Sequence, residues 1–179
     1  MPETITQNSA TWGIDRIDQV SRPLSQTYTY NYIGTGVTAF ILDTGINSDH
    51  TEFTGRIGAG SNFAPNADGR TVVANTGDCN GHGTHVAGTV GGKSYGVAKG
   101  VTLVPVRVLD CAGSGSNSGV IAGINWAAAT TTRPAVANMS LGGGLSSALN
   151  AAVAGAVNKG VTMVVAAGNS NRNACNYSP

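Results

Sequence analysis

The chain has 179 residues, ten of them basic and nine acidic, so its formal net charge near neutrality is +1. This length suits one domain with a hydrophobic core, and the balanced charge leaves no excess that would attract nucleic acid or an anionic membrane surface. No apolar run is long enough to span a bilayer and no signal peptide is visible, so we expect neither nucleic acid nor a membrane as a partner.

The N-terminal part is polar and carries a candidate cation site. We interpret residues 1–9, which show no periodicity, as a flexible tail or the remnant of a precursor junction. Asp15, Asp18 and Gln19 follow at a spacing that can converge on one turn, and calcium prefers such oxygen ligands. The alternative is a helix face with two solvated acidic side chains. Residues 23–32 indicate an irregular connection.

Residues 37–42 form an almost unbroken apolar run, typical of a strand that is buried on both faces of a parallel sheet. Asp43 follows directly. In open α/β sheets the functional groups lie just past the carboxyl ends of strands, so Asp43 is a candidate site residue, with a helix cap or turn as the alternative. Gly34 and Gly36 precede this strand, whereas a dinucleotide-binding fingerprint needs its glycines after the strand.

His82 lies between two glycines, and the residues that follow, 86–92, predict a helix. A sharp turn into that helix would present the imidazole at the helix start. Histidine exchanges a proton near neutral pH, so His82 is a candidate general base. The alternatives are that His82 and His85 have no chemical role, or that they form half of a metal site.

Strands and helices alternate along the rest of the chain. The strand of residues 101–109 contains Pro105, which requires a sheet edge or a bulge. The last helix is capped by Ser146 or Ser147 and stops at Gly160. Such alternation predicts an α/β fold with a doubly wound, mostly parallel sheet and helices on both faces. The further elements are a helix at 114–129, a short strand at 136–141, a buried strand at 161–167, and helix residues Leu149, Val153, Ala156 and Val157 at helical spacing.

Three residues at strand ends or helix starts, Asp43, His82 and Asn169, can meet at one edge of such a sheet. An acid that orients a histidine, a histidine that takes a proton and an amide that donates to an oxyanion are three of the four parts of an acyl-transfer site. The fourth part is a nucleophile.

The chain has three cysteines, Cys79, Cys111 and Cys175, which cannot all pair within one chain. A bridge between Cys79 and Cys111 would close a loop of about 33 residues. In the chain-entropy model it would stabilise the folded state by roughly 3 to 4 kcal/mol. Cys175 would then be a free thiol, part of an intermolecular bond, or paired with a residue outside this sequence.

Four motifs resemble those of the subtilisin-like serine proteases, in the same order and at similar spacing. The resemblance covers residues 10–179, and it is closest to the proteinase K branch and, within it, to the secreted, disulfide-bearing aqualysin-like enzymes. The motifs are ILDTG at 41–45, HGTHVAGT at 82–89, NMSLGG at 138–143 and VAAGN at 165–169, and the branch is indicated by residues 12–19, 78–81 and 107–111.

The resemblance implies a subtilisin-like fold and a role for each matching residue. Asp43 becomes the triad acid, His82 the general base and Asn169 the oxyanion-hole amide. A polypeptide substrate would lie as an extra strand between two segments, which implies broad specificity. Small residues in the pocket imply a preference for large apolar or aromatic side chains before the cut bond. The implied lining is Gly113, Ser114 and Gly115 on one side, Ser140, Leu141 and Gly142 on the other, and Ala166, Ala167 and Gly168 at the pocket wall.

The same resemblance implies a structural, non-catalytic calcium site and an extracellular location. Asp15, Asp18 and Gln19 would hold the ion, with Ser25 and Thr27 as weaker oxygen ligands. A disulfide between Cys79 and Cys111 fits an oxidising compartment. In aqualysin-like relatives the position of Cys175 pairs with a cysteine further along the chain.

The sequence departs from the family at the nucleophile. The family's serine belongs to a Gly-Thr-Ser-Met-Ala motif, and no serine of this sequence lies in one. We therefore expect residues 1–179 to be the N-terminal two-thirds of one subtilase catalytic domain, inactive alone, from a secreted monomeric endopeptidase whose signal peptide and inhibitory pro-segment lie outside this sequence. The alternatives are a non-catalytic peptide-binding remnant, and a metal hydrolase that uses His82, His85 and Asp43.

Overall fold

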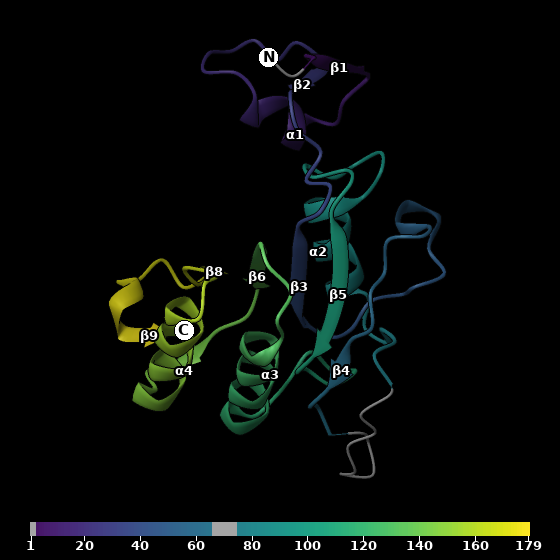
Figure 1. Ribbon diagram of the computed structural model, residues 1–179. Helices are drawn as coiled ribbons and strands as arrows, with labels where there is room; N and C mark the ends of the chain where they lie inside the picture. Colours follow the sequence, from purple (N-terminus) through teal and green to yellow (C-terminus); the bar gives the residue numbers. More distant parts are fainter. Residues whose placement is uncertain (1–2, 66–74) are drawn as a thin grey trace.

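The computed structural model describes residues 3–65 and 75–179 and is built around a five-stranded parallel sheet (Figure 1). The strand order is β4-β5-β3-β6-β8, and every neighbouring pair in it is parallel. The predicted α/β fold with a mostly parallel sheet is confirmed. The strands are β3 (Thr38–Asp43), β4 (Ser61–Asn62), β5 (Thr102–Arg107), β6 (Ala135–Met139) and β8 (Val161–Val165).

Helices cover both faces of the sheet, and the central strand β3 supplies side chains to both. Phe40 and Leu42 belong to a hydrophobic cluster with residues of α3 (Asn117–Ala129) and α4 (Ser147–Asn158). Ala39 and Ile41 belong to a second cluster with Ala87 of α2 (His82–Gly91). Because side chains alternate along β3, the sheet separates two hydrophobic cores, one on each face.

Two serine caps begin the helices α3 and α4. The Ser116 hydroxyl accepts a hydrogen bond from the Gly119 amide at 3.1 Å, and the Ser146 hydroxyl accepts one from the Leu149 amide at 3.3 Å. The helix α3 therefore starts at Asn117, later than the predicted Ser114. Residues 113–115 consequently form a loop.

Pro105 lies in β5, the second strand from the sheet edge, and not at the predicted edge or bulge. Leu103 exchanges backbone hydrogen bonds with Arg56 and Gly58, on the side away from β3. Two residues further along, Pro105 faces the same side, so its missing N–H removes no donor from the ladder with β3.

The prediction of a fully buried strand at 161–167 is wrong for its second half. Val164 and Val165 are 49% and 41% exposed, although Val161 is buried. Within the described residues β8 pairs only with β6, so one of its edges is open. Val157 of α4, predicted on the apolar face, is also exposed, whereas Leu149 and Ala156 are buried.

The N-terminal part forms a small unit at one end of the molecule (Figure 1). The strand β1 (Ile5–Asn8) pairs antiparallel with β2 (Thr27–Tyr30), and α1 (Trp12–Ile17) lies between them in the chain. The irregular connection predicted at residues 23–32 is wrong at β2, and residues 5–8 form a strand within the segment predicted as a flexible tail or precursor remnant. The hydroxyl of Tyr28 donates to the Val97 carbonyl at 3.2 Å and the amide of Gln7 donates to the Ser94 carbonyl at 2.9 Å, which fixes the unit to the rest.

The remaining described elements are short. The strand β7 (Gly143–Gly144) pairs antiparallel with β9 (Tyr177–Ser178), and two 3-10 turns are η1 (Thr51–Phe53) and η2 (Ala174–Asn176). None of the helices in residues 3–65 and 75–179 has the length and apolar character needed to cross a membrane.

Candidate active site

The structure brings Asp43 and His82 into direct contact. Asp43 is the last residue of β3 and fully buried, and His82 is the first residue of α2 with a half-exposed side chain. The His82 Nδ1 lies 2.8 Å from one Asp43 carboxylate oxygen and 3.0 Å from the other. Because an ionised carboxylate only accepts, Nδ1 is the donor, and Nε2 of the neutral ring keeps a lone pair that can take a proton.

Two glycines let α2 begin this close to the end of β3. Gly81 caps the helix with a left-handed φ of 102°, a conformation that favours glycine. A Cβ atom at Gly83 would lie 2.2 Å from the carbonyl oxygen of Gly45. A larger residue at Gly83 would therefore push the helix start away from β3.

Asp78 also fixes the start of α2, although the sequence did not predict it as a site residue. Its carboxylate joins the loop before His82, the first turn of α2 and the end of β3. Thr44 completes the link, because its hydroxyl also accepts from the Gly83 amide at 2.9 Å. The donors to Asp78 are the amides of Asn80, Gly81 and Thr84 and the hydroxyls of Thr44 and Thr84.

These hydrogen bonds stabilise the ionised form of Asp78. Burial alone would raise the pKa of this carboxyl group, but the bonds from Thr84, Gly81 and Asn80 outweigh burial and lower the pKa from 3.8 to about 2. The signal in the sequence was an aspartate four residues before His82, within reach of the amides at a helix start.

A disulfide connects the loop before His82 to the loop after β5. Cys79 and Cys111 are bonded, so this predicted pairing is confirmed, and Cys175 is free and exposed in the part of the chain that the structure describes. The carboxylate of Asp110 accepts from the amides of Ala112 and Ser114, both at 2.9 Å, and so shapes the turn that leads into residues 113–115.

His82 lines a cavity of about 570 Å³ together with both predicted peptide-binding segments. The cavity therefore has the histidine at one wall and the ends of β5 and β6 on either side. The predicted residues around it are Gly113, Ser114, Gly115, Ser140, Leu141 and Gly142.

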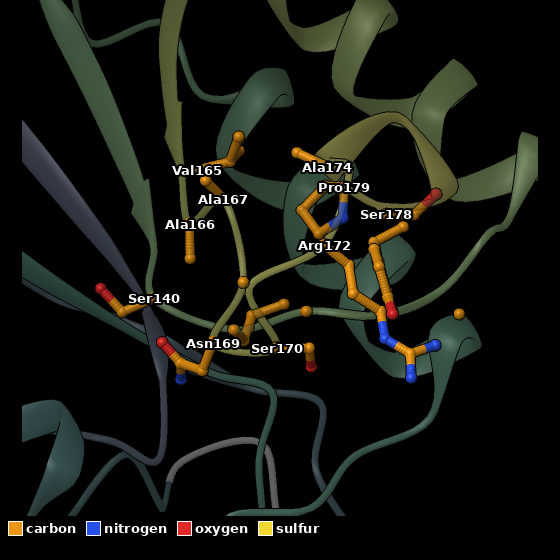
Figure 2. Close-up of a pocket in the computed structure, with 16 residues that line it drawn as sticks. Ser140, Val165, Ala166, Ala167, Asn169, Ser170, Arg172, Ala174, Ser178 and Pro179 are labelled. Atoms are coloured by element: carbon orange, nitrogen blue, oxygen red, sulfur yellow. The ribbon is translucent and has the colours of Figure 1, made fainter.

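Asn169 lines a second cavity of about 550 Å³, which Figure 2 shows. Residues 140–143 line both cavities, so they form the wall between them. The predicted residues Ala166, Ala167 and Gly168 belong to this second cavity. Among the described residues, Asn169 makes no hydrogen bond to Asp43 or His82, and it lies beyond β8, two strands away from β3.

The five predicted cation ligands lie in one hydrogen-bonded region of the N-terminal unit. The Asp15 carboxylate accepts from the amide and hydroxyl of Ser25, at 3.2 and 3.1 Å, and from the Gln26 amide at 2.7 Å. The Gln19 side-chain oxygen also accepts from the Ser25 amide, and the hydroxyls of Ser25 and Thr27 are 2.7 Å apart.

Asp18 has an oxygen that fits a cation. Its Oδ2 accepts from the Thr29 amide at 2.5 Å, whereas its Oδ1 is buried and has no hydrogen-bond partner. A buried carboxylate oxygen without a donor is costly unless a cation satisfies it. However, no group of three or more His, Cys, Asp or Glu side chains in residues 3–65 and 75–179 could hold a metal ion, so any ion here would depend on two carboxylates and neutral oxygens.

Comparison with known proteins gives consistent matches. The model of the Subtilase family matches residues 34–179. The extracellular serine proteinase of Thermus sp. (strain Rt41A) is 62% identical over 173 residues, which are 97% of this chain and 41% of that protein. The alkaline serine exoprotease A of Vibrio alginolyticus is 60% identical over 173 residues, 97% of this chain and 31% of that protein.

The fold matches as well. The crystal structure of a cold adapted subtilisin-like serine proteinase superposes with a TM-score of 0.90 at 56% identity, covering 96% of this chain and 61% of that one. The chain spans less than half the length of the Thermus and Vibrio proteins.

Proposed function

Because this chain belongs to the subtilase family, we propose that it supplies the acid, the general base and the oxyanion amide of a serine endopeptidase. His82 takes the proton from the nucleophilic serine, Asp43 holds the resulting imidazolium, and the Asn169 amide donates to the tetrahedral oxyanion. The observation that carries this proposal is the 2.8 Å contact between Asp43 and the His82 Nδ1 at the wall of a cavity.

The proposed substrate is a polypeptide that lies as an extra strand between residues 113–115 and 140–142. Main-chain hydrogen bonds give such a mode its affinity and make it tolerant of varied side chains. The apolar surface beside Ala166 and Ala167 favours a large apolar or aromatic side chain before the cut bond. The Cys79–Cys111 disulfide and the similarity to an extracellular serine proteinase of Thermus support a secreted enzyme, and we propose that it acts as a monomer.

The proposal assigns no nucleophile within these residues, because no serine of the printed sequence lies in a Gly-Thr-Ser-Met-Ala motif. We expect the purified 179-residue chain to leave a denatured protein substrate uncut. The longest naturally expressed protein that contains these residues should hydrolyse it, and His82→Ala in that protein should abolish the hydrolysis. Hydrolysis by the 179 residues alone that His82→Ala abolishes would contradict the missing nucleophile.

The rival function, a peptide-binding module, gives a different result in the same assay. Neither the 179-residue chain nor the longer natural protein would then hydrolyse the substrate, and both would still bind peptides. Peptide affinity measured with and without Asn169→Ala separates the two functions further, since an amide that mainly serves the oxyanion should contribute little to ground-state binding.

We also propose that Asp15, Asp18, Gln19, Ser25 and Thr27 hold a structural calcium ion. The support is the buried, unpartnered Oδ1 of Asp18. A site with two carboxylates should bind calcium weakly, because calcium affinity follows the charge of the ligands. The ion would tie α1 to β2 and take no part in peptide hydrolysis.

A further inference from the structure

The cavity beside Asn169 has an apolar end and a polar end. Figure 2 shows Val165, Ala167 and Ala174 toward one end, with Asn169 and Arg172 toward the other. An occupant that fills this space would therefore meet apolar surface at one end and hydrogen-bond donors at the other.

Arg172 is the one charged side chain among the residues that line this cavity. The sequence has no acidic residue after Asp110, while three basic residues follow it, Arg133, Lys159 and Arg172. The part of the chain that forms the cavity is therefore positively charged, although the whole chain is almost neutral.

The Arg172 guanidinium makes no ion pair and no hydrogen bond within residues 3–65 and 75–179, and the side chain is exposed. Arg133 differs, because its guanidinium donates to the carbonyls of Lys159 and Thr130 and so has a structural role. A guanidinium that is not used by its own fold can bind a carboxylate through two parallel hydrogen bonds.

We propose that Arg172 makes this site prefer acidic peptides, in which a carboxylate lies beside the apolar side chain that enters the cavity. The inference rests on the proposed peptide site and adds a substrate class to it. The apolar side chain fills the end near Val165 and Ala167, and the neighbouring carboxylate pairs with Arg172 at the polar end.

The size of the preference follows from the exposure of Arg172. Ion pairs between exposed groups are weak, so a glutamate in place of a glutamine should tighten binding by about 2- to 5-fold. Salt screens such pairs, and the preference should shrink at high ionic strength.

The test is peptide binding to the chain, measured by fluorescence anisotropy. The probes are labelled, end-blocked hexapeptides with one phenylalanine, in two series that place Glu, Gln or Lys directly before or directly after it. We expect the Glu peptide to bind more tightly than the Gln peptide in one series, and the Lys peptide to bind more weakly than both. The difference should fall when the sodium chloride concentration is raised to about 0.5 M.

Variants separate charge from shape. Arg172→Lys should keep the preference, Arg172→Ala should remove it, and Arg172→Glu should turn it toward the Lys peptide. Lys159→Ala, which removes an equal charge from outside the cavity, is the matched control and should leave the preference unchanged. Circular dichroism establishes that all variants are folded alike.

The failures of the two proposals differ. Equal binding of all peptides, or a Glu preference that survives Arg172→Ala, overturns the role of Arg172 and leaves the peptide site standing. If no peptide binds, the peptide site itself is wrong, and the preference is overturned with it.

Discussion

Asp78 accepts five hydrogen bonds beside the candidate site, and they hold together three parts of the chain. Asp43 and His82 lie on two of these parts, the end of β3 and the start of α2. Since the imidazole is aligned by the position of its helix, a carboxylate that fixes the helix start also fixes the contact between His82 and Asp43. Asp78 therefore acts on the pair through the backbone, since none of its hydrogen bonds in the described part of the chain goes to either side chain.

Replacing Asp78 with asparagine should lower the free energy of unfolding at pH 7 by about 1 to 3 kcal/mol, the usual size for hydrogen bonds to a charged group. The folded-state pKa of Asp78, about 2, lies below the ordinary value of 3.8. Its contribution is therefore present above pH 4 and disappears as the pH falls toward 2. Urea unfolding followed by circular dichroism at pH 7, 4 and 2 should show the two proteins converging at the acid end.

The matched control for this prediction is Asp49→Asn. The Asp49 side chain is exposed and makes no hydrogen bond in the described part of the chain, so its replacement should change the unfolding free energy by less than about 0.5 kcal/mol. A difference between Asp78→Asn and the unchanged protein that stays constant from pH 7 to pH 2 would contradict the role given to the ionised carboxylate.

The sequence was informative about Asp43 and His82 because each is marked locally, one by the buried strand before it and the other by its two glycines. Asp78 has no such mark. Its partner Thr44 is 34 residues away, and the bond between them exists only after β3 and α2 have met. Asn169 was also marked by a strand end, but its distance from His82 depends on how far apart β3 and β8 lie in the sheet.

At the scale of elements, the central strands and the helices were predictable from apolar runs and caps. The pair of β1 and β2 was not, because β1 is polar and mostly exposed, and the Thr-Tyr-Thr-Tyr alternation of β2, which buries Tyr28, lies within a Ser-, Thr- and Tyr-rich stretch that favoured irregular structure. The two strands are held in place by contacts with the loop of residues 94–99, where Gln7 and Tyr28 donate to the carbonyls of Ser94 and Val97. The Lys99 ammonium lies 5.5 Å from the centre of the Tyr28 ring and 5.8 Å from that of Tyr30.

Calcium should stabilise this N-terminal unit and, through it, the whole chain. At a free calcium concentration about 100 times the dissociation constant, the gain is expected to be about 2.7 kcal/mol. Asp18→Asn should remove the gain, because it takes away one of the two carboxylates and changes the oxygen that lacks a partner. The measurement is thermal unfolding with a calcium series against a chelator.

Asp49→Asn, outside this unit, serves again as the control and should keep the full calcium response. An equal rise in melting temperature for the unchanged chain and for Asp18→Asn would place the ion elsewhere. No response at any concentration up to about 10 mM, well above the weakest range known for calcium sites in proteins, would remove the proposed site altogether.

At the scale of the molecule, one covalent link joins two of the segments that border the His82 cavity. The Cys79–Cys111 bond spans 32 residues and connects the loop before α2 with the loop after β5. The pairing itself came from family resemblance, since three cysteines alone left it open. The structure adds that both bonded residues are next to segments that line the cavity.

Removing this bond with the double change Cys79→Ser and Cys111→Ser should lower the free energy of unfolding by about 2 to 4 kcal/mol. A thiol assay on the unreduced chain should count one thiol, the exposed Cys175, and three after reduction and unfolding. Cys175→Ser is the control, which should remove the single thiol with little loss of stability. Three reactive thiols before reduction would show that the bond does not form.

The position of β3 in the middle of the sheet also governs when the site can come into being during synthesis. Its two neighbours follow it in the chain, β5 by about 60 residues and β6 by about 100. At a translation rate of about 5 to 20 residues per second, β3 must wait roughly 5 to 20 seconds for its second partner. Pairing over such separations is also slow in itself. We therefore expect the contact between Asp43 and His82 to become fixed in the nascent chain only after β5 and β6 have joined β3.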